Sequence, residues 1–247
     1  MTITVITPTC DRPVGLALAE QFMRRQTRQP DEWIIADGGT VLATCTRGQT
    51  HLHTPGEPGP GNFLRNLLAG VACARGDLIA FVEDDDYYEP MHLEQLERQL
   101  ARDPRALAAG DDDQRYYNLA ARSWRTYHNL GACLCQTMFR RELLPRFVEI
   151  VRERLRLNSY GVDTTFWRAI PTDRRALEHG HTVVGIKGLP GRAGLGVGHR
   201  PDEKWHADPE LEQLRAWIGA HDLETYYRPV LTGLAMAAAI ERATCQA

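Results

Sequence analysis

The sequence predicts an α/β fold, a mostly parallel sheet flanked by helices, and two observations support this prediction. The first is a set of short apolar runs at residues 3–7, 32–36 and 78–82, whose composition is typical of buried strands. The second is that segments with apolar residues at helical spacing separate these runs. Alternating strands and helices favour βαβ units, whose strands lie parallel in one sheet.

The chain opens with a strand, a loop, a helix and a second strand. Residues 3–7 form a β-branched run that we expect to end at Pro8. A polar loop at residues 9–13 precedes a segment with helical spacing at residues 16–25. The second strand is expected at residues 32–36, where a polar turn stops it. This order indicates the first βαβ unit.

Two further helices enclose the third apolar run. We expect a short strand and then a loop rich in proline and glycine within residues 41–61. Asn62 is a candidate cap for the helix that follows this loop. The run at residues 78–82 comes next, and after Pro90 an amphipathic pattern of apolar residues predicts another helix: Met91, Leu93, Leu96 and Leu100.

Four consecutive carboxylates follow the third apolar run: Glu83, Asp84, Asp85 and Asp86. Like charges at this spacing repel each other and require a counter-charge. Carboxylate oxygens are hard ligands that suit Mg²⁺ or Mn²⁺. Open α/β sheets bind their ligands at the carboxyl ends of the strands, where this acidic run lies. The sequence therefore predicts a divalent-metal site here rather than a solvated acidic turn.

Composition restricts the class of protein less than these motifs do. The 247 residues are enough for one large domain, and a net charge of −3 indicates no particular partner. Lys187 and Lys204 are the lysines, so arginine supplies 27 of the 29 basic residues and offers bidentate phosphate contacts. The six cysteines form no Cys-x-x-Cys pair, which favours free thiols. With neither a signal peptide nor a spanning segment in the pattern, we expect a cytoplasmic protein.

The second half of the chain contains several less specific patterns. Residues 114–118 and 122–128 interleave aromatic and basic residues and predict a hairpin, whose aromatics either pack or stack on a sugar ring or a nucleobase. Arginines outnumber acids over residues 140–156, which indicates a solvated helix face or a phosphate track. Six glycines over residues 185–199 are typical of a linker. Residues 208–247 carry two helical patterns, which we expect to pack against the rest of the domain.

The order of four short motifs resembles the GT-A glycosyltransferases of family 2. These motifs are Thr7-Pro8-Thr9, Asp37-Gly38-Gly39-Thr40, Arg65-Asn66, and the acidic run with Pro90. The resemblance implies that a nucleotide-sugar donor lies across the carboxyl ends of the first strands. It also implies a DXD motif whose metal bridges the two phosphates of the donor. The residues expected to bind the donor are Pro8, Thr9, Asp11, Arg12, Asp37, Arg65, Asn66 and Asp84.

The same resemblance implies a set of metal ligands and a catalytic base. The expected ligands of Mn²⁺ or Mg²⁺ are Asp85, Asp86 and His199; the longer Glu83 is not among them. Residues 158–167 resemble the acidic motif that precedes an aromatic helix in the family, which makes Asp163 the candidate base for an inverting transfer. The alternative is that Asp163 only caps this helix. The glycine-rich segment at residues 185–199 then becomes a mobile lid.

Taken together, these patterns predict a single domain over residues 1–247. Residues 1–110 are expected to bind the nucleotide sugar, 111–200 to form the acceptor half and lid, and 201–247 to form C-terminal helices. The expected activity is metal-dependent, inverting transfer of a hexose from a UDP-sugar, by default UDP-glucose. The resemblance to small bacteriophage-type glycosyltransferases, with the arginines and aromatics, makes a flipped 5-hydroxymethylpyrimidine in DNA a candidate acceptor.

Three alternatives to this activity and acceptor remain open. A saccharide or small-molecule acceptor has nearly equal support. A sugar nucleotidyltransferase would share the general fold, but the sequence has no early glycine-rich loop with Arg and Lys for a triphosphate. A non-catalytic nucleic-acid-binding protein would have no need of Asp85 and Asp163.

Overall fold

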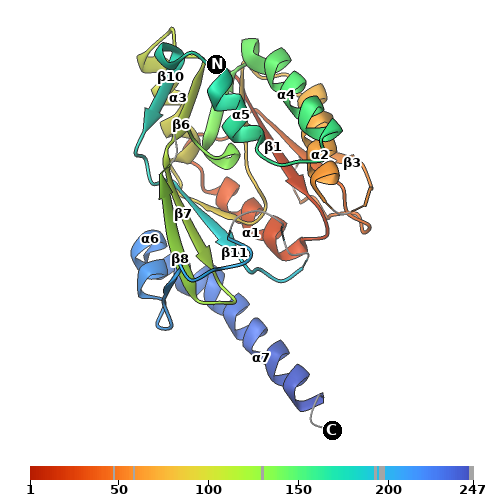
Figure 1. The fold of residues 1–247 in the computed structure, drawn as a ribbon, viewed down its shortest axis with the longest axis vertical. Coiled ribbons are helices and arrows are strands. Elements are labelled where there is room, and N and C mark those ends of the chain that lie inside the picture. The colour runs from red at the N-terminus through yellow and green to blue at the C-terminus, as the bar shows by residue number, and fades with distance from the viewer. Residues whose placement is uncertain (47, 58, 129–130, 192–193, 195–197, 245–247) are drawn as a thin grey trace.

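A computed structural model describes residues 1–46, 48–57, 59–128, 131–191, 194 and 198–244, with side-chain surroundings as far as residue 237. It is a mixed α/β domain in which a mostly parallel sheet is flanked by helices, as the sequence predicts. A second, smaller sheet lies beside the first and carries the C-terminal helices (Figure 1). The predicted fold class is therefore confirmed.

The larger sheet has seven strands within the described residues. Its first four members in the chain, β1 to β4, lie side by side in parallel; helix α1 (Pro13–Arg24) connects β1 to β2, and α2 (Pro60–Cys73) connects β3 to β4. Strand β9 is antiparallel to both of its neighbours. The order is β10 (Arg175–Glu178), β6 (Ala108–Asp111), β9 (Thr137–Arg140), β4 (Leu78–Phe81), β1 (Ile3–Thr9), β2 (Glu32–Asp37) and β3 (Thr50–His53).

Helices cover both faces of this sheet, and each face has its own hydrophobic core. The alternation of side chains along β1 separates the two cores, because Ile3 and Val5 enter one and Ile6 enters the other. The first core is covered by α1 (Pro13–Arg24) and α3 (His92–Arg102), through residues such as Phe22 and Leu96. The second is covered by α2 (Pro60–Cys73), α4 (Leu144–Arg156) and α5 (Val162–Ala169).

The smaller sheet contains the predicted hairpin. Strands β7 and β8 pair antiparallel, and β11 joins β7 to β5 at the acidic run. The order is β12 (His206–Ala207), β8 (Ser123–His128), β7 (Asp113–Asn118), β11 (Val183–Lys187) and β5 (Asp86–Tyr88). The remaining short helices are η1 (Leu134–Gln136), η2 (Arg141–Leu143) and η3 (Thr172–Arg174).

The glycine-rich segment differs from its prediction as a linker, because it begins inside β11. Every residue of this strand is buried, and Gly185 lies so close to Tyr116 that a Cβ would be 2.7 Å from the ring. The prediction rested on the number of glycines. It gave no weight to the apolar residues Val183, Val184 and Ile186, which are typical of a buried strand. Residues 192–193 and 195–197 of the expected lid lie outside the described residues, so the lid stays a prediction.

Strand β1 also differs from its prediction, because it continues through Pro8 to Thr9. Strand β4 pairs with β1 only as far as Ile6, so at the level of Pro8 the neighbour is β2 alone. A proline, which has no main-chain N–H to donate, is tolerated where a strand has a hydrogen-bonded neighbour on one side only. The parallel strand therefore extends to the place where the site is built.

Asn62 is not the cap of α2. Gly59 precedes the first helical residue, Pro60, and the Asn62 side chain is buried instead. Its amide Nδ2 donates to the carbonyl oxygens of Gly38, at 2.9 Å, and Gly56, at 2.8 Å. Asn62 therefore fastens two loops to the start of the helix.

The C-terminal helices pack against the domain only in part. Helices α6 (Glu212–Asp222) and η4 (Leu223–Tyr227) contribute Leu214 and Leu223 to the first core. Helix α7 (Arg228–Thr244) buries Leu231, whereas Met236 is 62% exposed and the helix projects away from the domain (Figure 1). Among the described residues, no helix combines the length and the apolar character that a membrane span requires.

Candidate active site

A cavity of about 650 Å³ opens at the carboxyl ends of β1 and β4. Its walls are formed by the acidic run, the loop after β1, the start of α5 and the hairpin. A cavity of similar volume, about 640 Å³, lies at the amino ends of β1 and β2 beside Ile3 and Glu32, away from the acidic run. The first cavity contains most of the residues predicted for the site: Pro8, Thr9, Arg12, Asn66, Asp84, Asp85, Asp86, Asp163 and His199.

The acidic run is a tight turn between the two sheets, because β4 ends at Phe81 and β5 begins at Asp86. The hydroxyl of the buried Tyr88 accepts a hydrogen bond from the Glu83 N–H at 2.7 Å and donates to the Glu83 carbonyl at 3.3 Å. On the other side, a Cβ on Gly15 would be 2.7 Å from the main-chain oxygen of Asp84. Helix α1 therefore approaches the turn as closely as a glycine allows.

Arg12 neutralises the first part of the turn. Its Nη1 lies 2.9 Å from Oδ1 of Asp84 and 3.0 Å from Oδ2 of Asp85. Thr9 donates its hydroxyl to the other oxygen of Asp84 at 2.6 Å. Asp84 is thus held by two groups, Thr9 at the end of β1 and Arg12 in the loop that follows.

Lys187 neutralises the second part of the turn, and His199 lies beside it. The Lys187 Nζ lies 2.8 Å from Oδ1 of Asp86 and 3.1 Å from Oδ1 of Asp85. The His199 Nε2 lies 3.3 Å from Oδ2 of Asp85. Together with Arg12, three basic side chains surround the Asp85 carboxylate, which is 5% exposed.

These charges, together with burial, give the four carboxyl groups different pKa values. Burial opposes ionisation of Asp85, but attraction to Lys187 and Arg12 outweighs it and places the pKa of Asp85 below its ordinary value. Burial raises the pKa of Asp84 and Asp86, and it raises the pKa of Glu83 well above its ordinary value. Burial also opposes the charge on Lys187, but the carboxylates around it raise the pKa of Lys187 and keep it an ammonium.

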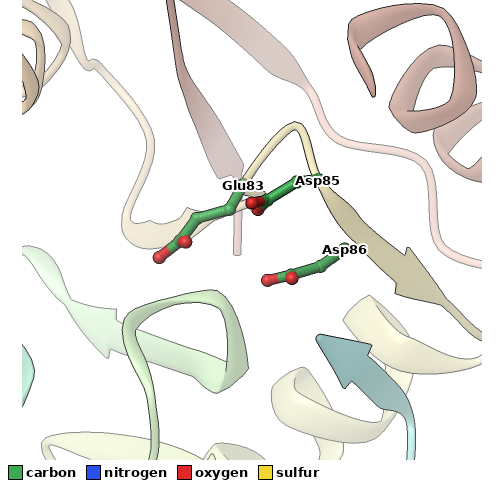
Figure 2. Close-up of side chains that lie close together, drawn as sticks. All are labelled: Glu83, Asp85 and Asp86. Atoms are coloured by element: carbon green, nitrogen blue, oxygen red, sulfur yellow. The ribbon is translucent and has the colours of Figure 1, made fainter. Parts of the chain in front are cut away.

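Three of the carboxylates fit a divalent cation. Oxygen atoms of Glu83, Asp85 and Asp86 lie within 4.8 Å of one another, and their side chains point to the same side of the turn (Figure 2). Asp85 Oδ1 is buried and accepts no hydrogen bond from any residue that the structure describes. Oxygen donors at this spacing suit Mg²⁺ or Mn²⁺. The expected ligand His199 lies beside this group rather than within it, and Glu83 joins the group.

The other predicted donor-binding residues hold loops around the cavity. Asn66 donates to the Thr9 carbonyl at 3.0 Å and accepts from the Thr54 hydroxyl at 2.6 Å. Asp37 is fully buried and accepts from the N–H groups of Gly39 and Ala43, both at 2.8 Å.

Asp11 lies in the loop after β1, and Arg65 lies on α2. Asp11 accepts from the Thr40 N–H at 2.8 Å. Arg65 is exposed on α2, and its guanidinium lies against the main chain of Gly56. Asp11, Asp37 and Arg65 are not among the described residues that line the cavity.

Asp163 enters the cavity from the first turn of α5. Gly161, with φ of 91°, occupies the cap position of this helix, and the Asp163 carboxylate accepts from the Thr164 N–H at 2.7 Å. Burial raises the pKa of Asp163 above its ordinary value. Asp163 and the three carboxylates of the candidate metal group line the same cavity.

An aromatic wall lies on the hairpin side of the cavity. The rings of Tyr116 and Tyr127 meet edge to face with centroids 5.5 Å apart, and the Arg125 guanidinium lies 4.3 Å from the Tyr127 centroid. The Tyr116 hydroxyl lies 3.1 Å from the Cys133 sulfur. Tyr160 and Phe63 also line the cavity.

The arginines near α4 have partners within the protein. Arg140 donates to the carbonyl of Ala106 at 2.8 Å, and Arg141 donates to the carbonyl of Gly76 at 2.7 Å. Arg146 forms an exposed ion pair with a neighbouring glutamate on α4, and Arg154 donates to a threonine hydroxyl of α5. Arg140 and Arg141 therefore anchor the main chain, whereas Arg146 remains exposed.

Sequence reasoning did not assign a role to Lys187, Cys133 or Cys135, all of which line the cavity. One signal for Lys187 was available, because it is one of two lysines in an arginine-rich chain and follows an apolar run. The cysteines carry no such signal, since their place in the cavity depends on the pairing of β9 with β4 and β6.

The fold and the site define an α/β protein that binds its ligand in a carboxylate-lined cavity at the carboxyl ends of its strands. Residues 4–167, well over half of the chain, match the sequence model of glycosyl transferase family 2. The chain belongs to this family, which confirms the resemblance and makes it a GT-A glycosyltransferase that uses a nucleotide-sugar donor. A comparison with curated proteins found no match.

Proposed function

We propose that this glycosyltransferase is metal-dependent and inverting, and that it moves a hexose from a UDP-sugar, by default UDP-glucose, to an acceptor hydroxyl. One observation carries the proposal: the metal group of Glu83, Asp85 and Asp86 and the carboxylate of Asp163 line the same cavity. Glycosyl transfer by inversion requires both a site for the leaving diphosphate and a base for the acceptor.

On this proposal, the donor lies over the loops that follow β1 and β2. The metal, held by Glu83, Asp85 and Asp86, would supply stabilisation of the charge that develops on the leaving nucleoside diphosphate. Arg12 and Thr9 orient Asp84 at the floor of the cavity, and Asn66 fixes the main chain of Thr9. Residues 1–110 thus supply the donor half of the site.

Asp163 is the proposed base. Burial raises the pKa of Asp163, which makes its carboxylate a stronger proton acceptor than that of an exposed aspartate. The same carboxylate binds the Thr164 N–H, which fixes its orientation on a rigid helix. The proton of the acceptor hydroxyl passes to Asp163 as the oxygen attacks the anomeric carbon.

The aromatic wall of Tyr116, Tyr127 and Tyr160 is the proposed acceptor side, because flat rings stack on sugars and on nucleobases alike. A 5-hydroxymethylpyrimidine in DNA and a saccharide or small molecule are both retained as acceptors. The internal partners of Arg140 and Arg141 reduce the support for a phosphate track, and therefore favour the smaller acceptor.

The test is Mn²⁺-dependent release of UDP from UDP-glucose by the full chain. We expect release that a chelator abolishes and that falls at least about 100-fold in Asp85→Asn and Asp163→Asn. Asp173→Asn, a change at an exposed aspartate outside the cavity, is the matched control and should behave as wild type. Folded protein that releases no nucleotide from any nucleotide sugar would contradict the proposal.

The acceptor is tested in the same assay with two additions. DNA containing 5-hydroxymethylcytosine and a panel of saccharides are compared at equal hydroxyl concentration. Stimulation by the DNA alone would assign DNA modification, and stimulation by a saccharide alone would assign the smaller acceptor. In either case Tyr127→Ala should raise the KM for the acceptor and leave the affinity for UDP unchanged, because Tyr127 belongs to the proposed acceptor wall and not to the metal group.

A further inference from the structure

We propose that Lys187 is a resident counter-cation that competes with the divalent metal for Asp85 and Asp86, and so lowers the metal affinity of the donor-free protein. The inference deepens the proposed function, because it concerns the metal site on which that function rests. It makes Lys187 a positioning residue with a measurable effect on metal binding, separate from any effect on sugar transfer.

The contacts of Lys187 are the first step. Its ammonium is 2.8 Å from Asp86 Oδ1 and 3.1 Å from Asp85 Oδ1, and these two carboxylates are also two of the three members of the metal group. Asp85 Oδ1 accepts no hydrogen bond within the described part of the chain, so its approach to Lys187 is an ion pair without hydrogen-bond geometry. The lysine and a metal ion would therefore share the same oxygens.

The second step is that Lys187 has little freedom to leave. It is 5% exposed and ends β11, whose main chain pairs with β7 and β5. Its Nζ lies 5.8 Å from the centroid of Tyr116, and a Cβ on Gly198 would be 3.0 Å from its Cγ. A metal bound to the carboxylates would thus remain close to the ammonium, and two cations held close together in a poorly solvated site repel each other.

The third step is the charge balance of the turn. Four carboxylates, Glu83 to Asp86, face two permanently charged side chains, Arg12 and Lys187. A divalent ion would add positive charge beside these carboxyl groups and so reduce the repulsion that an approaching diphosphate meets. Lys187 therefore reduces metal affinity while it favours the anionic donor, so that the metal binds tightly only together with the nucleotide.

The experiment measures Mn²⁺ binding to the full chain, without any nucleotide, from the electron paramagnetic resonance signal of the free ion. Lys187→Met should bind Mn²⁺ about tenfold more tightly than wild type, because the competing charge is removed. Lys187→Arg keeps the charge and should stay close to wild type. Lys204→Met, a change at the exposed lysine, is the matched control. Equal or weaker binding by Lys187→Met would overturn the proposal.

A second measurement uses the wild-type protein and does not depend on a folded variant. With isotope-labelled lysine the chain gives side-chain signals from Lys187 and Lys204 only. Titration with Mg²⁺ should shift the Lys187 signal and leave that of Lys204 in place. A Lys187 signal that stays fixed at saturating Mg²⁺ would overturn the proposal. Neither readout involves sugar transfer, so a failure of the transferase assignment would appear separately, as absent UDP release with intact metal binding.

Discussion

Gly15 lies directly against the main-chain carbonyl of Asp84, where a Cβ would be only 2.7 Å from the oxygen. The contact joins the first turn of α1 to the acidic turn that carries the metal group. Because the blocking atom belongs to the main chain, a larger residue cannot be accommodated by a change of side-chain rotamer. The position of the carboxylates therefore depends on a residue with no functional group of its own.

Gly15→Ala should displace the acidic turn. We expect weaker Mn²⁺ binding, loss of most UDP release and a lower Tm, although alanine has the higher helix propensity. The matched control is Gly233→Ala in α7, where a Cβ would meet no atom within 4 Å. That substitution should raise stability by up to about 1 kcal/mol. Unchanged metal binding in Gly15→Ala would contradict this prediction, because it would show that the acidic turn adjusts to the added methyl group without displacing its carboxylates.

Asp163→Asn should lower kcat with little change in the affinity for UDP. Loss of a general base typically costs about 10²- to 10⁴-fold in rate. In the wild type, activity should fall as pH falls through the pKa of Asp163, which burial raises above its ordinary value. Rate measurements over pH, with UDP affinity by calorimetry, test both expectations. A parallel loss of UDP affinity would instead indicate a structural role.

The same substitution should stabilise the protein at neutral pH. A carboxyl group with a raised pKa in the folded state binds its proton more tightly there than in the unfolded chain. Its ionisation therefore costs stability above the folded-state pKa, and the cost disappears as pH falls below the ordinary value. Asp163→Asn should thus exceed wild type in urea resistance at neutral pH and match it in acid. Equal urea resistance of the two proteins at both neutral and acid pH would contradict a raised pKa of Asp163 in the folded state.

His92 should make the protein sensitive to mild acid. Burial lowers the pKa of His92 from its ordinary 6.5 to about 3, and its Nδ1 lies 2.8 Å from the Thr182 hydroxyl. The unfolded chain takes up the proton first, so this contribution to stability is complete above 6.5 and is lost as pH falls toward 3.

The expected slope is about 1.4 kcal/mol per pH unit within that window, from His92 alone. His92→Asn, which cannot gain this charge, should have a flatter dependence of the free energy of unfolding on pH. Parallel curves for the two proteins would assign the acid sensitivity to other groups.

Asp222 connects the C-terminal helices to β5. It accepts from Arg25, whose guanidinium also stacks on nearby aromatic rings, and from the Tyr87 hydroxyl at 2.6 Å. Asp222→Ala should lower the free energy of unfolding by about 2–3 kcal/mol, because hydrogen bonds to a charged group are lost at a buried position.

The control for this change is Asp202→Ala. Its pair with Arg125 is half exposed and should contribute less than about 1 kcal/mol. Thermal and urea unfolding of both variants give the comparison. Similar losses for Asp222→Ala and Asp202→Ala would mean that the C-terminal helices are not held through Asp222.

The parts of the fold that could be predicted are those with a local signal. The runs that became β1, β2 and β4 are apolar on both faces, and the acidic run follows the last of them. The hairpin of β7 and β8 was likewise predictable from its alternation. These patterns predicted the acidic run at the carboxyl end of a buried strand, whereas Asp163 was predicted from the resemblance of residues 158–167 to a family motif.

The remaining parts depend on pairing between distant segments. Strand β9 enters between β4 and β6 in the opposite direction, and no local pattern near Thr137 or Arg140 specifies those neighbours. A metal was expected to supply the counter-charge of the acidic run. Lys187, 101 residues after Asp86 in the chain, supplies part of it instead. The sequence contains the lysine, but only the register of β11 brings it to Asp86.

The acidic turn has a further consequence for how this gene can change in length. Residues 82–85 link the two sheets, and Tyr87 and Tyr88 beyond them face opposite sides of β5, toward Asp222 and Glu83. An inserted or deleted codon in this link that shifted β5 by one position would exchange those faces. Residues 120–122, by contrast, are exposed in the turn of the hairpin. Length variation among descendants of this sequence is therefore expected in the hairpin turn and not in the acidic turn.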